Sequence, residues 1–197
     1  MTHEANSISE RPFKRKKEVK PPKKITETYL TNSGKFYLER FPASTEQFRR
    51  VMTRKINKSC KAHPDQALET CVVALDNVIR KFQEIGFLND AGYATGLARS
   101  LKNRGWPRSR ILMRLKEKGV PAEIIEEAVE ESAPDEDFRN TLVWIKRKRL
   151  GAYATTEKTQ EKSLAALARA GFDYDTASRA LELSKEEIME ILEGGQP

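Results

Sequence analysis

Glycine and proline divide residues 86–128 into three short segments, and this punctuation constrains the fold more than any other feature of the chain. Gly105 and Gly119 suit helix C-termini, because glycine readily adopts the left-handed conformation that ends a helix. Pro107 and Pro121 follow two residues later, where proline fits the first turn of the next helix. The pattern predicts three consecutive helices of roughly 10–14 residues each.

Each predicted helix of this stretch has one apolar face. Asn89 or Asp90 can cap the first helix. The apolar residues at helical spacing are Tyr93, Leu97 and Leu101, then Ile111, Leu112 and Leu115, and finally Ile124, Ile125, Ala128 and Val129. Helices this short cannot bury such faces alone, so we expect them to pack on one another and on neighbouring units.

The flanking sequence contains similar runs, which indicates diverged copies of one unit. We expect a first three-helix repeat at residues 25–87, a second at 88–133, and a third at 134–197 with an added C-terminal helix. When the second helices are aligned, Gly119 matches Gly171. No useful alternating strand pattern is present. The sequence therefore predicts an all-α fold, an elongated tandem array of three-helix, helix-turn-helix-like repeats.

The two outer repeats contain their own boundary signals. Ser44 with Gln47 matches a capping box, and so does Ser184 with Glu187, which would open the added helix. Residues 57–63 are polar and are predicted to form a linker. Pro64 then suits the start of a longer helix.

Most of the net charge of +7 lies at the N-terminus. Residues 1–24 hold eight basic and three acidic side chains, three prolines and few apolar groups. Such a segment cannot offset its ordering entropy, so we expect a disordered basic tail. Its basic run, Lys14, Arg15, Lys16 and Lys17, is either a salt-sensitive arm for phosphate groups or a solubilising tail.

The chain offers little material for catalysis or metal binding. Cys60 and His63 have a CxxH spacing and Cys71 follows, but a closed zinc site needs four ligands, and the other histidine is His3 in the tail. No phosphate-binding glycine loop, calcium loop or catalytic triad pattern appears. We therefore expect a non-enzyme without metal or cofactor, in which the cysteines are structural.

Apolar segments and cysteine usage predict the compartment. No apolar stretch reaches the length of a signal peptide core or a membrane span. The two cysteines give no disulfide framework, which favours a reducing environment. We expect a cytoplasmic protein that does not associate with membranes.

The middle repeat carries a family resemblance. Residues 86–90, Tyr93-Ala94, Arg99, Arg104-Gly105, Pro107-Arg108, Arg110-Ile111, Leu115 and Lys118-Gly119 resemble the signature of the RecX regulators of the bacterial recombinase RecA. Residues 171–175 resemble that family's C-terminal motif, and residues 44–50 its first-unit helix. The resemblance covers roughly residues 26–183. The chain departs from the family pattern at Trp106 and Ala177, and in the tail and the last helix.

The resemblance implies a function through binding. A RecX-like array would bind RecA, lie in the groove of the RecA–DNA filament, and restrain filament growth, ATP hydrolysis, strand exchange and co-protease activity. We expect a monomer whose partners are RecA and this filament, with weak non-specific binding to nucleic acid.

A basic face on the middle repeat is compatible with that role. If Ile111 and Leu115 face the core, Arg110 and Arg114 emerge together on the outward side. The contact candidates are Arg99, Lys102, Arg104, Arg108, Arg110 and Arg114, and a second basic group is Lys146, Arg147, Lys148 and Arg149. The alternative is a solvated face on which Glu117 pairs with Arg114, and simple helix-end electrostatics for the second group. Trp106 is expected to brace the turn rather than to stack on a base.

Two other functions compete with this hypothesis. Residues 176–188 have the outline of a DNA-binding helix-turn-helix, but the second helix of that motif is rich in glutamate and would repel phosphates. The other is a helical-repeat adaptor that acts without RecA.

Overall fold

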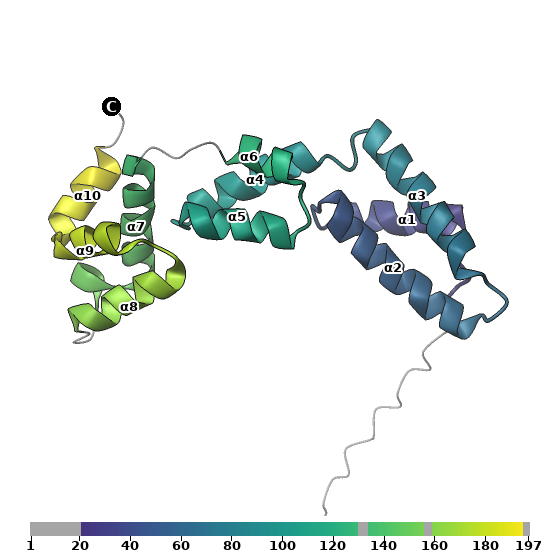
Figure 1. The fold of residues 1–197 in the computed structure, drawn as a ribbon, viewed down its shortest axis with the longest axis horizontal. Coiled ribbons are helices and arrows are strands. Elements are labelled where there is room, and N and C mark those ends of the chain that lie inside the picture. Colours follow the sequence, from purple (N-terminus) through teal and green to yellow (C-terminus); the bar gives the residue numbers. More distant parts are fainter. Residues whose placement is uncertain (1–20, 130–133, 156–158, 195–197) are drawn as a thin grey trace, which may run out of the picture.

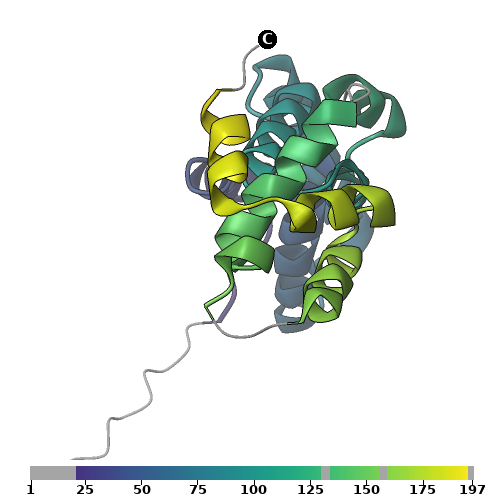
Figure 2. The same cartoon turned by 90° about the vertical axis from the view of Figure 1, so that its left-hand side faces the viewer.

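The computed structural model describes residues 21–129, 134–155 and 159–194, and every regular element in these ranges is helical. The helices form three successive groups along the longest axis of the molecule (Figure 1). Seen from one end, the groups lie behind one another (Figure 2). The predicted all-α, elongated array of three-helix repeats is confirmed.

The three groups contain the following elements. The first group consists of α1 (Glu27–Leu38), α2 (Thr45–Ala62) and α3 (Leu68–Glu84), and the second of α4 (Asp90–Lys102), α5 (Arg108–Glu117) and α6 (Ala122–Ala128). The third consists of α7 (Pro134–Lys148), the short 3-10 helix η1 (Gly151–Tyr153), α8 (Gln160–Ala170), α9 (Tyr174–Glu182) and α10 (Lys185–Glu193). Helix α6 has seven residues and is shorter than predicted. The backbone leaves the helical conformation at Val129.

Each group has a separate hydrophobic core. The largest fully buried side chains are Phe48, Met52 and Leu75 in the first group, Ile111 and Leu115 in the second, and Leu142, Leu167 and Ile188 in the third. Burial of an apolar side chain of this size contributes about 1.5–3 kcal/mol to the stability of the fold. Because Ile188 belongs to α10, the added C-terminal helix is part of the third core rather than an appendage.

The predicted linker at residues 57–63 is wrong, because α2 continues to Ala62. Ile56 is fully buried and Ser59 is 1% exposed, so the inward face of the helix runs on through this stretch. The other polar residues of this helical stretch, Asn57, Lys58 and Lys61, are exposed on the outer face of the same helix.

The helix predicted to begin at Pro64 begins instead at Leu68. The turn before it is held by the side chain of Gln66, which accepts from the backbone N–H of Ile25 at 3.1 Å and donates to its carbonyl at 2.7 Å. These two bonds connect the turn to a residue distant in sequence. A local sequence pattern does not reveal such a contact.

The two capping boxes differ in the structure. Ser184 and Glu187 each bond the backbone N–H of the other, so the box that opens α10 is complete. Ser44 accepts from the backbone N–H of Gln47 at 3.1 Å, but the Gln47 side chain donates to the Tyr37 hydroxyl at 3.3 Å. The box at α2 is therefore only half formed.

The second helices of the three groups, α8, α5 and α2, meet end to end. Ser109 in the first turn of α5 donates its hydroxyl to the carbonyl of Gly171, which follows α8, at 3.1 Å. Ser44, which caps α2, donates in the same way to the carbonyl of Lys118 after α5. A Cβ atom on Gly119 would lie 2.6 Å from a side-chain atom of α2. Both junctions thus place a helix start on a neighbouring helix end, with glycine at the closest approach.

An aromatic contact also joins the second and third groups. Trp106, in the turn before α5, packs edge-on against Trp144 of α7 with ring centroids 6.3 Å apart. Trp144 in turn packs against Phe172 at 6.0 Å. Trp106 therefore packs in the junction between the groups, which agrees with a bracing role for this residue.

Candidate functional site

Helix α5 presents the basic face expected from the sequence. Ile111 and Leu115 are fully buried on its inner side, whereas Arg110 is half-buried and Arg114 is exposed. The two arginines, one turn apart, line a shallow pocket of about 200 Å³ together with Trp106, Met113 and Glu117. The apolar spacing of α5 thus determines where both guanidinium groups lie.

Local contacts orient the two arginines and leave both side chains at least partly accessible to solvent. The Arg110 guanidinium carbon lies 5.3 Å from the centroid of the Trp106 ring, a cation–π contact. Arg114 donates from Nη1 to Glu117 Oε2 at 2.8 Å. A solvent-exposed ion pair of this kind contributes only about 0–1 kcal/mol, so an anionic partner can replace Glu117 at little cost.

The other predicted residues of the second group fall into two sets. Arg99 is exposed on α4. Lys102 instead forms an ion pair with Glu136 of α7, with Nζ 2.9 Å from Oε1. The guanidinium of Arg108 donates to the carbonyl of Val129 at 3.3 Å. Lys102 and Arg108 are thus engaged within the chain, Lys102 at the junction between groups, because partners distant in sequence lie beside them.

The second basic group lies at the same junction. Lys146, Arg147, Lys148 and Arg149 are all exposed at the end of α7. Arg147 donates from Nη1 to the carbonyl of Arg104 at 3.4 Å, and the Lys148 ammonium lies 5.2 Å from the centroid of the Trp144 ring. The structure therefore brings the run at the end of α7 next to Arg104, which sequence spacing alone does not indicate.

Helix α2 carries a row of cations that the sequence analysis missed. Arg50, Arg54 and Lys58 follow one another at four-residue spacing and are exposed. Arg50 donates from Nη1 to the carbonyl of Glu117 at 3.0 Å, so this row begins where the pair on α5 ends. We call Arg110, Arg114, Arg50, Arg54 and Lys58 together the basic row. The four-residue spacing in α2 is visible in the sequence, but its continuity with α5 depends on the junction between the helices.

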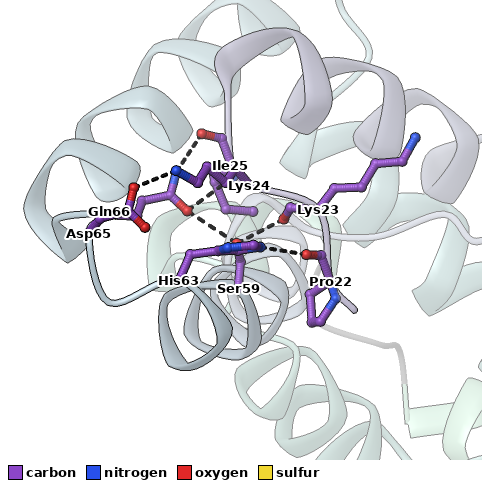
Figure 3. Close-up of polar contacts among 8 residues, drawn as sticks. All are labelled: Pro22, Lys23, Lys24, Ile25, Ser59, His63, Asp65 and Gln66. Carbon is purple, nitrogen blue, oxygen red and sulfur yellow. Dashed lines mark hydrogen bonds and ion pairs between the residues drawn. The ribbon is translucent and has the colours of Figure 1, made fainter. Parts of the chain in front are cut away.

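The basic tail enters the molecule through a set of polar contacts, which we call the N-terminal clasp (Figure 3). The clasp consists of Ser59, His63 and Gln66 holding residues 22–25. Ser59 donates to the carbonyl of Lys23 at 2.8 Å, and the His63 ring Nε2 lies 2.7 Å from the carbonyl oxygen of Pro22. The last residues of the predicted tail are thus bound to the first group, because the buried Ser59 of α2 and the half-buried His63 and Gln66 after it form hydrogen bonds with their backbone. The tail candidates Lys14, Arg15, Lys16 and Lys17 lie outside the described residues.

One pKa shift marks the clasp. Lys24 forms an ion pair with Asp65 in the turn between α2 and α3. Its hydrogen bond lowers the pKa of the Asp65 carboxyl below the ordinary value. Both side chains are more than half exposed, so this pair adds little to stability.

The alternative sites have less support. In the described ranges, no cluster of three or more histidine, cysteine or acidic side chains could hold a metal ion, and no helix is both long and apolar enough to span a bilayer. The outer face of α10 exposes Glu186, Glu187, Glu190 and Glu193. Such a face would be repelled by the phosphates of a DNA groove, because both carry negative charge.

Comparison with known proteins identifies relatives of this chain. A family model described as the second three-helix domain of RecX matches residues 89–129, which span α4 to α6. A protein of Myxococcus xanthus named Regulatory protein RecX is 33% identical over 174 residues, which cover 86% of this chain and 92% of that protein. The chain belongs to the RecX family.

Further relatives carry the same name. Regulatory protein RecX of Agrobacterium fabrum is 25% identical over 170 residues, or 84% of this chain and 88% of that protein. Regulatory protein RecX of Deinococcus radiodurans is 31% identical over 98 residues, or 50% of this chain and 46% of that protein. No solved structure matches the chain significantly. The RecX domain match includes Arg99, Arg110 and Arg114, whereas the three residues of the basic row on α2 all lie outside it.

Proposed function

We propose that this RecX-family protein regulates the recombinase RecA by binding RecA and the RecA–DNA filament. Its main effect is to limit filament growth, ATP hydrolysis, strand exchange and co-protease activity. The protein acts in the cytoplasm by binding alone and performs no chemistry of its own. The observation that carries this proposal is membership of the RecX family over most of the chain, since the name RecX denotes a regulatory protein in each relative.

The basic row supports a contact with a long, negatively charged partner. Its cations lie on two helices that meet end to end, Arg110 and Arg114 on α5 and three more on α2. Among the described residues, only Glu46 and Glu117 form ion pairs with these cations, Glu46 with Arg50 and Glu117 with Arg114. A net positive row of this kind attracts an acidic or phosphate-bearing surface and speeds association at low salt.

The proposal is tested with purified RecA on single-stranded DNA. We expect the protein, added at substoichiometric amounts, to slow RecA-dependent ATP hydrolysis and strand exchange. A control variant carries Lys35→Glu and Arg80→Glu. These changes reverse the charge of two exposed cations, on α1 and α3, that do not belong to the basic row. This variant should inhibit as the original chain does. A folded, helical protein without effect in either assay would overturn the proposal.

A further inference from the structure

The two cysteines of the chain meet where the long helices of the first group turn back on each other. Cys60 lies in the last turn of α2 and Cys71 in the first turn of α3. Their sulfur atoms are 3.9 Å apart. They are the only cysteines in the sequence, so neither has another possible partner within the chain.

The two thiols differ in access. Cys71 is 3% exposed and belongs to the core of the first group. Cys60 is half-buried and packs against that core from the outside. Burial, followed by the contact with Cys60, raises the pKa of the Cys71 thiol. A reagent in solution therefore reaches Cys60 first. Cys71 is shielded by the core and stays protonated.

The distance between the sulfurs is short enough for a covalent bond. A disulfide holds its sulfurs about 2.05 Å apart, so the two atoms have to approach by about 1.9 Å. The pair is thus arranged as an accessible thiol with a second, protected thiol in contact with it.

We propose that Cys60 and Cys71 form a redox site that a low-molecular-weight disulfide oxidises. The Cys60 thiolate attacks one sulfur of the small disulfide, which forms a mixed disulfide and releases one small thiolate that takes up a proton. Cys71 then loses its proton and attacks the Cys60 sulfur, which releases the second small thiol. Two protein thiols are oxidised, and one small disulfide is reduced to two thiols. This site goes beyond the proposed function, since it requires no recombinase.

The bond would close the turn that carries the N-terminal clasp. Residues 61–70 lie between the two cysteines, and they include His63 and Gln66, which hold residues 22–25 (Figure 3). Cross-linking the ends of α2 and α3 removes the open forms of this turn from the accessible ensemble. The oxidised protein therefore holds the base of the basic tail more firmly against the first group than the reduced protein does.

The experiment treats the full-length protein with oxidised glutathione and follows three quantities. We expect both free thiols to disappear, with a mass loss of two hydrogen atoms, no attached glutathione and reversal by dithiothreitol. The midpoint of thermal unfolding should rise by about 5–10 °C, as for a bond that closes a short loop. Amide hydrogen exchange should slow in residues 61–70 and 23–25.

Two variants make the result specific. In Cys71→Ala we expect glutathione to remain attached to Cys60 without a rise in the unfolding midpoint. In Cys60→Ser we expect Cys71 to stay unreactive while the protein is folded. If Cys71→Ala fails to fold, peptide mapping of the oxidised original chain identifies the bond directly. The proposal is overturned if the original chain ends as a glutathione adduct or a cross-linked dimer, or if the internal bond forms without slower exchange in residues 61–70. None of these outcomes bears on RecA.

Discussion

A Cβ atom on Gly105 would lie 2.6 Å from the carbonyl oxygen of Asn140, so the turn before α5 contacts the backbone of α7 directly. Gly105 also has a φ of 73°, in the left-handed region that favours glycine. Gly105→Ala should therefore lower the stability of the second and third groups by about 2–4 kcal/mol, from backbone strain and crowding together. Calorimetric unfolding measures this loss.

The matched control for Gly105 is Gly96→Ala. Gly96 lies inside α4, and nothing approaches its Cβ position within 4 Å. Alanine in a helix interior is favoured over glycine by about 1 kcal/mol, so this variant should be slightly more stable. Equal losses for both substitutions would show that the close approach to Asn140 does not matter.

The second prediction concerns Arg110 and Arg114. The double variant Arg110→Glu, Arg114→Glu should bind the RecA–DNA filament at least tenfold more weakly, because it reverses two charges of the basic row. Its unfolding midpoint should change little, since exposed ion pairs and cation–π contacts contribute about 1 kcal/mol or less each. Binding is measured by the salt-dependent retention of the protein on assembled filaments. A large drop in the unfolding midpoint would instead assign these arginines a structural role.

The third prediction extends the surface to α2. Arg54→Glu with Lys58→Glu should reduce filament binding in the same direction as the α5 variant, because the basic row is continuous across the junction at Glu117. The two pairs of changes should also flatten the dependence of binding on salt concentration to a similar extent. Unchanged binding by the α2 variant would limit the contact surface to the second group.

The fourth prediction is a pH effect at the start of α9. The Asp173 side chain caps this helix, and its hydrogen bonds from Thr176 lower the pKa of the carboxyl. A carboxyl with a lowered pKa stabilises the fold above its unfolded pKa, and this contribution is lost as the pH falls through the folded pKa. Stability of the third group should therefore decline below about pH 4, the ordinary range for aspartate.

Asp173→Asn is the control for this effect. Asparagine caps a helix about as well as aspartate but does not titrate, so the variant should keep its stability near neutrality and lose part of the acid dependence. Asp173→Ala should cost about 0.5–2 kcal/mol at neutral pH. Thermal unfolding between pH 2 and pH 7 is the measurement, and an unchanged acid profile in Asp173→Asn would contradict the assignment.

Local signals predicted much of this fold because they act within a few residues. Gly105 and Gly119 have positive φ, as expected from their place after apolar helical runs, and Gly86 and Gly171 share this conformation. The polar stretch at residues 57–63 misled the same reasoning. There, the apolar face of α2 narrows to Ile56 and a buried Ser59, so tertiary contact rather than composition maintains the helix.

The candidate surface was predictable only in part. The positions of Arg110 and Arg114 follow from the apolar spacing of a single helix. The engagement of Lys102 by Glu136 depends on a residue 34 positions away, so no local pattern contains it. The hydrogen bond from Arg50 to the carbonyl of Glu117 is not contained in a local pattern either, because it forms where the first and second groups join.

The end-to-end contacts of the second helices have a consequence for how such a chain can diverge. At both junctions the accepting atom is a backbone carbonyl, that of Lys118 in one and of Gly171 in the other. Every amino acid supplies that atom. Substitutions in the cores can therefore accumulate while the distance from one unit to the next stays the same, provided that the donor serine and a small residue at the closest approach remain. The spacing of the units thus depends on the main chain and on one serine at each junction, and it can be inherited by relatives that share few other side chains.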